Sequence, residues 1–210
     1  VLAANSESNR KLIITDGVFS MDGDIAPLDE IDKLAKEYGA MVYVDDCHGE
    51  GVLGETGAGI VDHFGLQGSI DFETGSFSKA LGVQGGILAG TEMTRTHALN
   101  HSRSWLLSGS QPPGVAAAQK AAVEVLMEEP EHHRKLWNNT EYFRSELQTM
   151  GFDTGVSTTP IIPVMCGESS VAKDFTTELA KEGVMAGAIV FPMVARDKAR
   201  IRTQMSAGLT

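Results

Sequence analysis

The first part of the chain alternates short apolar runs with one amphipathic stretch. Lys11–Thr15 (KLIIT) has the pattern of a strand. Met41–Asp45 (MVYVD) is a short, nearly continuous apolar run, as expected of a strand covered on both faces. Between them Pro27 suits a first helical position and Gly39 a C-terminal cap. The apolar residues in between fall on one helical face: Leu28, Ile31, Leu34, Ala35 and Tyr38. This strand–helix–strand order predicts a parallel sheet covered by helices.

Glycine and proline positions divide the rest of the chain. Five glycines among residues 49–59 predict a loop, and strands are expected near Ser69–Thr74 and at Gly86–Ala89. A long helix is expected from Pro112–Pro113 through Leu126, and Pro130 breaks it. The pattern then predicts a second helix to about Met150, a helix at Val171–Lys181, and strands at Ile161–Met165, Val184–Val190 and Ala199–Met205.

The change of pattern along the chain predicts two domains. Residues 1–122 are expected to form part of a larger domain with a mainly parallel sheet. Residues 123–210 are expected to form a small α+β domain, truncated at its end. Because the chain does not begin with Met and opens on a polar stretch, we expect it to be a piece of a longer protein.

Composition narrows the function classes. The net charge of −11 over 210 residues argues against non-specific binding to nucleic acid or to an anionic membrane. Two cysteines do not make a disulfide framework or a zinc site, and no segment resembles a signal peptide or a membrane span. We therefore predict a cytoplasmic protein. A phosphorylated cofactor remains compatible with this charge, because a local pocket can still be rich in donors.

Two polar segments follow expected strands. Asp45–His48 (DDCH) ends one strand, and Ser76–Lys79 (SFSK) follows the next, with a glycine-rich tail after it. Ligands of open α/β sheets sit beyond the carboxyl ends of strands, where both segments lie. A lysine amine, a carboxylate and hydroxyl donors are what pyridoxal 5′-phosphate (PLP) requires: the amine forms a Schiff base, and the carboxylate keeps the pyridine nitrogen protonated.

Each signal is weak alone. A single loop lysine is usually a surface residue, and an aspartate at a strand end is usually a turn or cap residue. The run before Lys79 (TGSFSK) lacks the spacing of a phosphate-binding Walker loop. His48 beside Asp45 and Asp46 could suggest a metal, but no second His or Cys cluster has suitable spacing, so no metal site is predicted.

Five runs together carry a family resemblance. The chain resembles the α-oxoamine synthases, PLP-dependent enzymes of the aspartate-aminotransferase-like α/β fold (PLP fold type I). These enzymes condense an amino acid with an acyl-coenzyme A. The matching runs are spread over almost the whole chain in the family's order: Thr15–Asp24, Val44–Gly49, Gly75–Gly82, Leu107–Pro112 and Ala199–Ala207.

The resemblance implies roles for individual residues. Lys79 would form the Schiff base, Asp45 would pair with the pyridine nitrogen, and His48 would contact the ring hydroxyl and assist proton transfer. Arg202 would hold the carboxylate of the amino-acid substrate, a task suited to a planar guanidinium. Further cofactor contacts would come from Ser20, from Ser76 at the phosphate, and from two residues supplied by the neighbouring subunit of a homodimer, Ser108 and Gly109.

The resemblance also implies substrates. The runs at Ile161–Met165 and Ala199–Ala207 look most like the glycine C-acetyltransferase (2-amino-3-ketobutyrate coenzyme A ligase) branch, which joins glycine to acetyl-CoA in threonine metabolism. The alternatives are 8-amino-7-oxononanoate synthase or a member that uses another acyl-CoA. An alternative of another class is an interaction domain without catalysis, because the family's chains are about twice as long. We expect this chain alone to be inactive.

Overall fold

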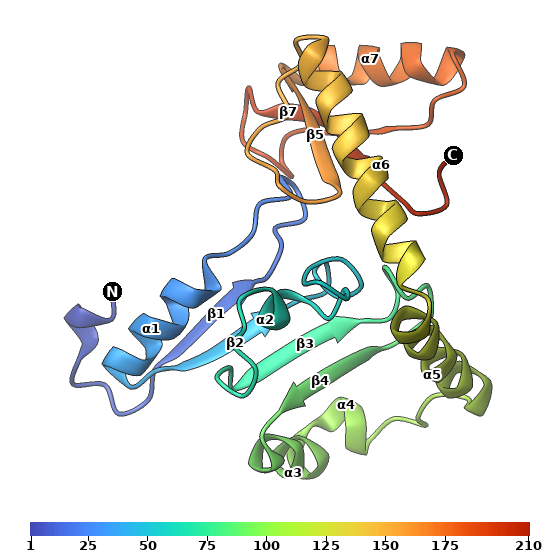
Figure 1. Cartoon of the computed structure of the whole chain (residues 1–210). Coiled ribbons are helices and arrows are strands. Elements are labelled where there is room, and N and C mark those ends of the chain that lie inside the picture. The colour runs from blue at the N-terminus through green and yellow to red at the C-terminus, as the bar shows by residue number, and fades with distance from the viewer. The chain divides into compact units, whose positions relative to one another are not determined.

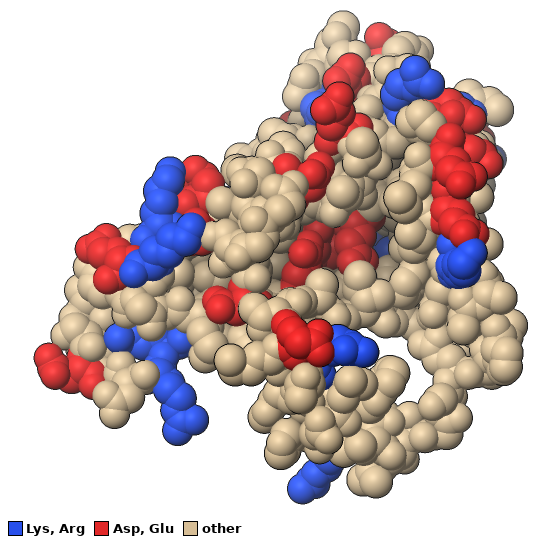
Figure 2. All heavy atoms as spheres, turned by 60° about the horizontal axis from the view of Figure 1, so that its bottom comes forward, with Lys and Arg blue, Asp and Glu red and all other residues tan.

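The computed structural model describes all residues, 1–210, and they form two compact units (Figure 1). Unit 1 comprises residues 1–18 and 26–130, and unit 2 comprises residues 19–25 and 131–210. The predicted boundary after residue 122 falls inside a continuous helix, whereas the units separate at Pro130. No helix combines the length and the apolar character needed to cross a membrane. Acidic side chains are prominent on the face in Figure 2, in keeping with the net charge.

Unit 1 is built on a four-stranded sheet with the order β1-β2-β3-β4. β1 pairs with β2 and β2 with β3 in parallel, while β4 runs antiparallel to β3 (Figure 1). The strands and helices of this unit are β1 (Leu12–Asp16), α1 (Leu28–Tyr38), β2 (Met41–Asp45), α2 (Ile60–His63), β3 (Phe72–Ser76), β4 (Gly86–Gly90), α3 (Glu92–His101), α4 (Arg103–Leu106) and α5 (Pro113–Glu128), preceded by a short 3₁₀ turn at Ala3–Asn5.

The first strand–helix–strand unit forms as its pattern predicts. α1 buries Leu28 and Ala35, and two acidic residues occupy its first turn, where they oppose the positive end of the helix dipole. Gly39 ends the helix in the left-handed conformation (φ 60°), which a glycine adopts without steric cost. β2 is buried at Val42 and Val44, the centre of the sheet.

Unit 1 departs from the expected elements at β3, at the short unpredicted helix α2, and at the helices α3 and α4. β3 begins at Phe72, three residues later than expected, because the carboxylate of Asp71 rather than the backbone accepts the Val42 amide at 2.8 Å. α3 and α4 were not predicted. Neither α3 nor α4 buries a residue, so the sequence lacks the apolar stripe from which such helices are predicted.

Unit 2 consists of a three-stranded antiparallel sheet with two helices. Its order is β5-β7-β6, and the central strand β7 carries the buried residues Arg200 and Ile201. The elements are α6 (Pro130–Thr149), β5 (Ile161–Gly167), α7 (Ser169–Lys181), β6 (Gly187–Ile189) and β7 (Ala199–Gln204). Pro130 separates α5 from α6, as the sequence predicts.

The early segment Phe19–Ile25 belongs to unit 2. Arg200 of β7 forms an ion pair with Asp22, and the hydroxyl of Thr159 donates to the carbonyl of Gly23 at 2.8 Å. Gly23 has a φ of 73°, and an added Cβ would overlap the carbonyl of Ile161. Only glycine therefore fits where this segment meets the small sheet.

Candidate active site

The carboxyl ends of β1, β2 and β3 meet at one edge of the large sheet. The amide of Gly17 donates to the carbonyl of Asp45 at 2.7 Å, and the amide of Asp46 donates to the carbonyl of Thr74 at 2.7 Å. The Asp45 carboxylate itself accepts the amide of Cys47 at 3.1 Å. Asp45 is therefore fixed at the strand end, with one of its oxygens bonded to the turn that follows.

Lys79 lies in a tight turn just beyond the neighbouring strand. Phe77 is buried and anchors the segment, while the Lys79 side chain is exposed. The amide of Gly82 donates to the carbonyl of Lys79 at 3.1 Å. The hydroxyls of Ser76 and Ser78 lie 2.6 Å apart, and the Ser78 amide donates to the Ser76 hydroxyl at 3.3 Å. The segment thus carries an exposed lysine and, within three residues of it in sequence, two paired hydroxyls.

His48 lies in the turn after β2. The carbonyl of Asp46 accepts the amides of Gly49 at 2.9 Å and Glu50 at 3.0 Å, so this turn folds back on the strand end and holds His48 half-buried. Because β2 and β3 are parallel neighbours, their ends bring Asp45, His48, Ser76 and Lys79 to one edge of the sheet.

Ser108 and Gly109 lie on the exposed loop between α4 and α5, and nothing would meet a Cβ at Gly109. This loop is anchored near the glycine-rich segment after Lys79, because Gln119 donates both to Gln111, at 2.6 Å, and to the carbonyl of Gln84, at 2.7 Å. No contact of Ser108 beyond its own turn is present among its hydrogen bonds, so its role as a contact to a neighbouring subunit stays a prediction.

Arg202 and Ser20 lie in unit 2. Nε and Nη2 of Arg202 are buried without a hydrogen-bond partner, and burial lowers the pKa of its guanidinium. Arg200, two residues earlier, pairs with Asp22 and donates to the carbonyl of Lys198 at 2.9 Å. Arg200 therefore forms bonds within unit 2, whereas two nitrogens of Arg202 have no hydrogen-bond partner, and the assignment of Arg202 to the substrate carboxylate stays a prediction. Ser20 is half-buried.

Two acidic residues of this edge were not singled out by sequence reasoning. Asp46 is fully buried, and its Oδ2 accepts the amide of Ile60 at 2.8 Å while its Oδ1 has no partner. Burial, reinforced by the nearby carboxylates of Glu73 and Glu50, raises the pKa of Asp46 to about 8. The side chain of Glu50 accepts the amide of Ser76 at 3.0 Å. Asp45 and Asp46 are adjacent in the sequence, and no sequence pattern shows which of the two carboxylates is buried and which is available to a cofactor.

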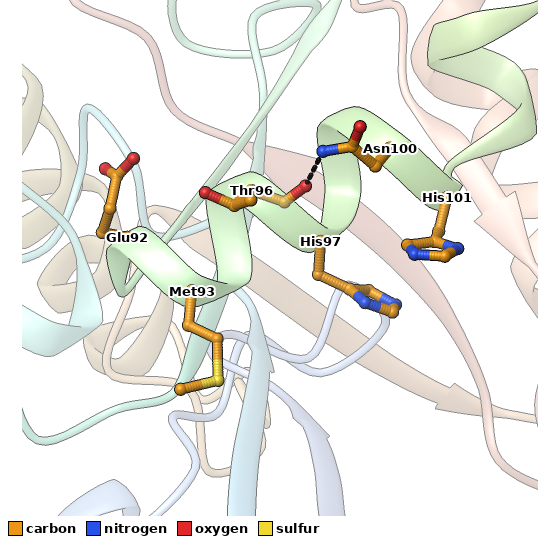
Figure 3. Close-up of a pocket in the computed structure, with 6 residues that line it drawn as sticks. All are labelled: Glu92, Met93, Thr96, His97, Asn100 and His101. Carbon is orange, nitrogen blue, oxygen red and sulfur yellow. Dashed lines mark hydrogen bonds between the residues drawn. The ribbon is translucent and has the colours of Figure 1, made fainter.

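A shallow pocket lies elsewhere in unit 1, along α3 (Figure 3). The imidazoles of His97 and His101 stack with their centroids 4.5 Å apart, and Asn100 donates to the carbonyl of Thr96 at 2.7 Å. All its lining side chains come from one exposed helix, so no second element converges on it. It contains none of the predicted residues.

Comparison with known proteins gives matches over the whole chain. The family model for aminotransferase class I and II matches residues 1–210. The 8-amino-7-oxononanoate synthase 1 of Bacillus subtilis (strain 168) is 50% identical over 207 residues, covering 99% of this chain and 53% of the relative. The 8-amino-7-oxononanoate synthase of Fervidobacterium nodosum is 53% identical over 201 residues, covering 96% and 51%. The chain spans about half the length of these curated relatives.

Solved structures also match the whole length of this chain. A serine palmitoyltransferase from S. paucimobilis, solved with a bound PLP–myriocin aldimine, has a TM-score of 0.93 and 32% identity. It is covered to 53% of its length by the whole of this chain. A serine palmitoyltransferase from Sphingomonas wittichii has a TM-score of 0.93 and 29% identity, with the same coverage. These matches confirm the predicted aspartate-aminotransferase-like α/β fold and a PLP-dependent family.

Proposed function

Because the chain belongs to the class I and II aminotransferase family, we propose that it forms part of a PLP-dependent α-oxoamine synthase. Such an enzyme joins an amino acid to an acyl thioester. The observation that carries the proposal is the placement of Asp45 and Lys79 at the ends of neighbouring parallel strands. The 50% identity to proteins named 8-amino-7-oxononanoate synthase supports the reaction class.

The residues at this edge fit the cofactor. Lys79 offers an exposed amine, and Ser76 and Ser78 offer paired hydroxyls for a phosphate. Asp45 offers a carboxylate held by a backbone amide, and His48 an imidazole one turn further on. A PLP site needs an amine, an acid for the ring nitrogen and phosphate donors, and this set contains all three kinds of group.

PLP, when bound, supplies an aldehyde that takes up an amine and a ring that accepts an electron pair from the neighbouring carbon. We assign the remaining tasks to the chain. Asp45 holds the proton of the ring nitrogen, and Ser76 donates to the phosphate. Lys79 and His48 move a proton at the α-carbon of the amino acid. Arg202 binds the substrate carboxylate through the donors that its own fold leaves unpaired.

The names of the relatives point to the acyl group. 8-Amino-7-oxononanoate is a nine-carbon acid whose C1–C7 correspond to a seven-carbon dicarboxylic acyl group. Its C8, C9 and amino group correspond to alanine after loss of CO₂. We therefore favour a seven-carbon dicarboxylic acyl thioester and alanine as substrates, with release of the thiol and CO₂.

Glycine with acetyl-CoA, the pair favoured by the sequence, becomes the second candidate. It is supported by the runs at Ile161–Met165 and Ala199–Ala207, while the relatives above carry the other name. An assay of a protein that contains this chain and has the full length of the relatives, with each acyl-CoA and amino acid pair, separates the two by which pair releases free CoA. Release with neither pair would reject both assignments.

We further propose a homodimer in which Ser108 and Gly109 reach the neighbouring site. The chain alone, covering about half the length of its relatives, is expected to bind PLP without turnover. An interaction domain without cofactor binding is the contrasting possibility.

The test of the Lys79 assignment uses the chain itself. The chain is mixed with PLP, reduced with borohydride and digested, and the modified peptide is identified by mass spectrometry. We expect the label on Lys79, loss of the visible band in Lys79→Ala, and no loss in Lys120→Ala, a matched exposed lysine on α5. Label distributed evenly over exposed lysines would reject the assignment.

A further inference from the structure

Glu50 connects the two polar segments of the candidate site. It belongs to the turn after β2, where its amide donates to the carbonyl of Asp46 at 3.0 Å. Its carboxylate Oε2 accepts the amide of Ser76, at the end of β3, at 3.0 Å. One residue is therefore bonded to both the turn that carries His48 and the segment that carries Lys79.

The Glu50 carboxylate supplies a hydrogen-bond acceptor for β3 at a position that β2 does not reach. Along the β2–β3 pair the last backbone bond runs from the Asp46 amide to the carbonyl of Thr74. β2 has ended by then, so the Ser76 amide on the same side of β3 has no backbone acceptor, and the side chain of Glu50 supplies one. Gly75 leaves the space for it, because an added Cβ there would overlap the carboxylate.

The residue after Glu50 makes a second contact with the lysine segment. Gly51 has a φ of 75°, and an added Cβ would lie 2.6 Å from the Cβ of Ala80. Ala80 directly follows Lys79 in the chain. Glu50 is thus hydrogen-bonded to one end of the segment from Ser76 to Ala80, and Gly51 lies close to the other end.

The carboxylate also lies in a defined electrostatic setting. Burial is the main cause that raises the pKa of Glu50, and Asp45 adds to it, while the Ser76 amide and Lys79 lower it. Asp46, Glu73 and Cys47 also interact electrostatically with Glu50. Lys79 is the cation whose charge lowers the pKa of Glu50, so the two side chains interact electrostatically.

We propose that Glu50 is a positioning residue of the Lys79 site: its carboxylate ties the Ser76–Lys79 segment to the Asp45–His48 turn and sets negative charge against the lysine. The inference rests on the proposed function, because only a cofactor-binding lysine requires such placement. Lys79 performs the chemistry, and Glu50 acts through it.

Two variants separate the hydrogen bond from the charge. Glu50→Gln keeps an acceptor for the Ser76 amide and removes the charge, whereas Glu50→Ala removes both. Glu55→Gln, at an exposed position of the same loop, is the matched control. Hydrogen exchange of the Ser76 amide, followed by NMR on the chain without cofactor, reports the bond. We expect Glu50→Ala to speed exchange about tenfold or more, and Glu50→Gln and Glu55→Gln to leave it within about threefold.

The charge is tested on the PLP-loaded chain, from the pH midpoint of its visible absorbance change. Removing a negative charge disfavours the protonated lysine–cofactor nitrogen, so the midpoint in Glu50→Gln should fall by about 0.5 to 1 pH unit, with no change in Glu55→Gln. An unchanged exchange rate of the Ser76 amide in Glu50→Ala would overturn the proposed link between the two segments. An unchanged pH midpoint in Glu50→Gln would overturn the proposed effect of the Glu50 charge on Lys79. If PLP fails to label Lys79 in the wild-type chain, the proposed function fails. The hydrogen-exchange comparison still shows whether Glu50 holds the Ser76 amide.

Discussion

The buried carboxyl of Asp46 makes the stability of unit 1 depend on pH. Its side chain is fully buried, its Oδ2 accepts the Ile60 amide, and its Oδ1 has no partner. Since Oδ2 already accepts a bond, a proton bound by Asp46 resides on Oδ1. Asn places an NH₂ group where the neutral acid has its O–H, so Asp46→Asn imitates the protonated form and cannot ionise.

The sign follows from the pKa of the group in the two states. It is about 8 in the folded chain and near its ordinary 3.8 in the unfolded chain. The folded state therefore binds the extra proton between these values, and the free energy of unfolding falls as pH rises from about 4 to about 8, by up to about 1.4 kcal/mol per pH unit. Between pH 5 and pH 7 the loss is about 2 to 3 kcal/mol, a large part of a typical domain's stability.

Urea unfolding at pH 5, 6 and 7, followed by circular dichroism, measures the effect. The unfolding midpoint of the wild type should fall steadily, while that of Asp46→Asn should fall much less, so the variant's advantage grows with pH. Asp174→Asn, on the exposed face of α7, should follow the wild type. Wild-type and Asp46→Asn midpoints that decline in parallel would refute a protonated Asp46.

Three further outcomes follow from the structure. Gly49→Ala places a Cβ into the Asp46 carboxyl and should cost about 1 to 3 kcal/mol of unfolding free energy, measured by urea titration. Burial raises the pKa of the Cys47 thiol to about 11, so alkylation by iodoacetamide at pH 8 should be at least about tenfold slower than in urea; equal rates would contradict this. Arg200→Met breaks the Asp22 pair and should lower the thermal midpoint, whereas Arg202→Met should leave it within about 2 °C while weakening amino-acid binding in the longer protein.

Local pattern predicted much of the fold. The apolar face of α1, its glycine cap and the continuous run of β2 each follow from residues close in sequence. α3 was missed because a helix that buries no residue has no apolar stripe, and the antiparallel direction of β4 depends on its pairing with β3 rather than on its own sequence. The late start of β3 depends on the Asp71 side chain, which replaces a backbone acceptor.

The candidate site also combines features that the sequence predicts with features that depend on distant contacts. The positions of Asp45 and Lys79 at the ends of neighbouring strands could be predicted because strand ends are marked in the sequence, while their roles rest on the family resemblance and stay predictions. Glu50 could not, because its bond to Ser76 joins residues 26 positions apart through a side chain whose direction no periodicity records. The different uses of Arg200 and Arg202 depend on Asp22, which lies in the first tenth or so of the chain.

The membership of Phe19–Ile25 in unit 2 has a consequence for synthesis. A ribosome releases this segment more than a hundred residues before its partners Thr159 and Arg200 are synthesised. The hydrogen bond of Gly23 with Thr159 and the ion pair of Asp22 with Arg200 can therefore form only after the intervening chain has been synthesised. Unit 2 cannot be completed in the order of translation, so its final assembly is a late, long-range step that joins residues 131–210 to the segment at residues 19–25.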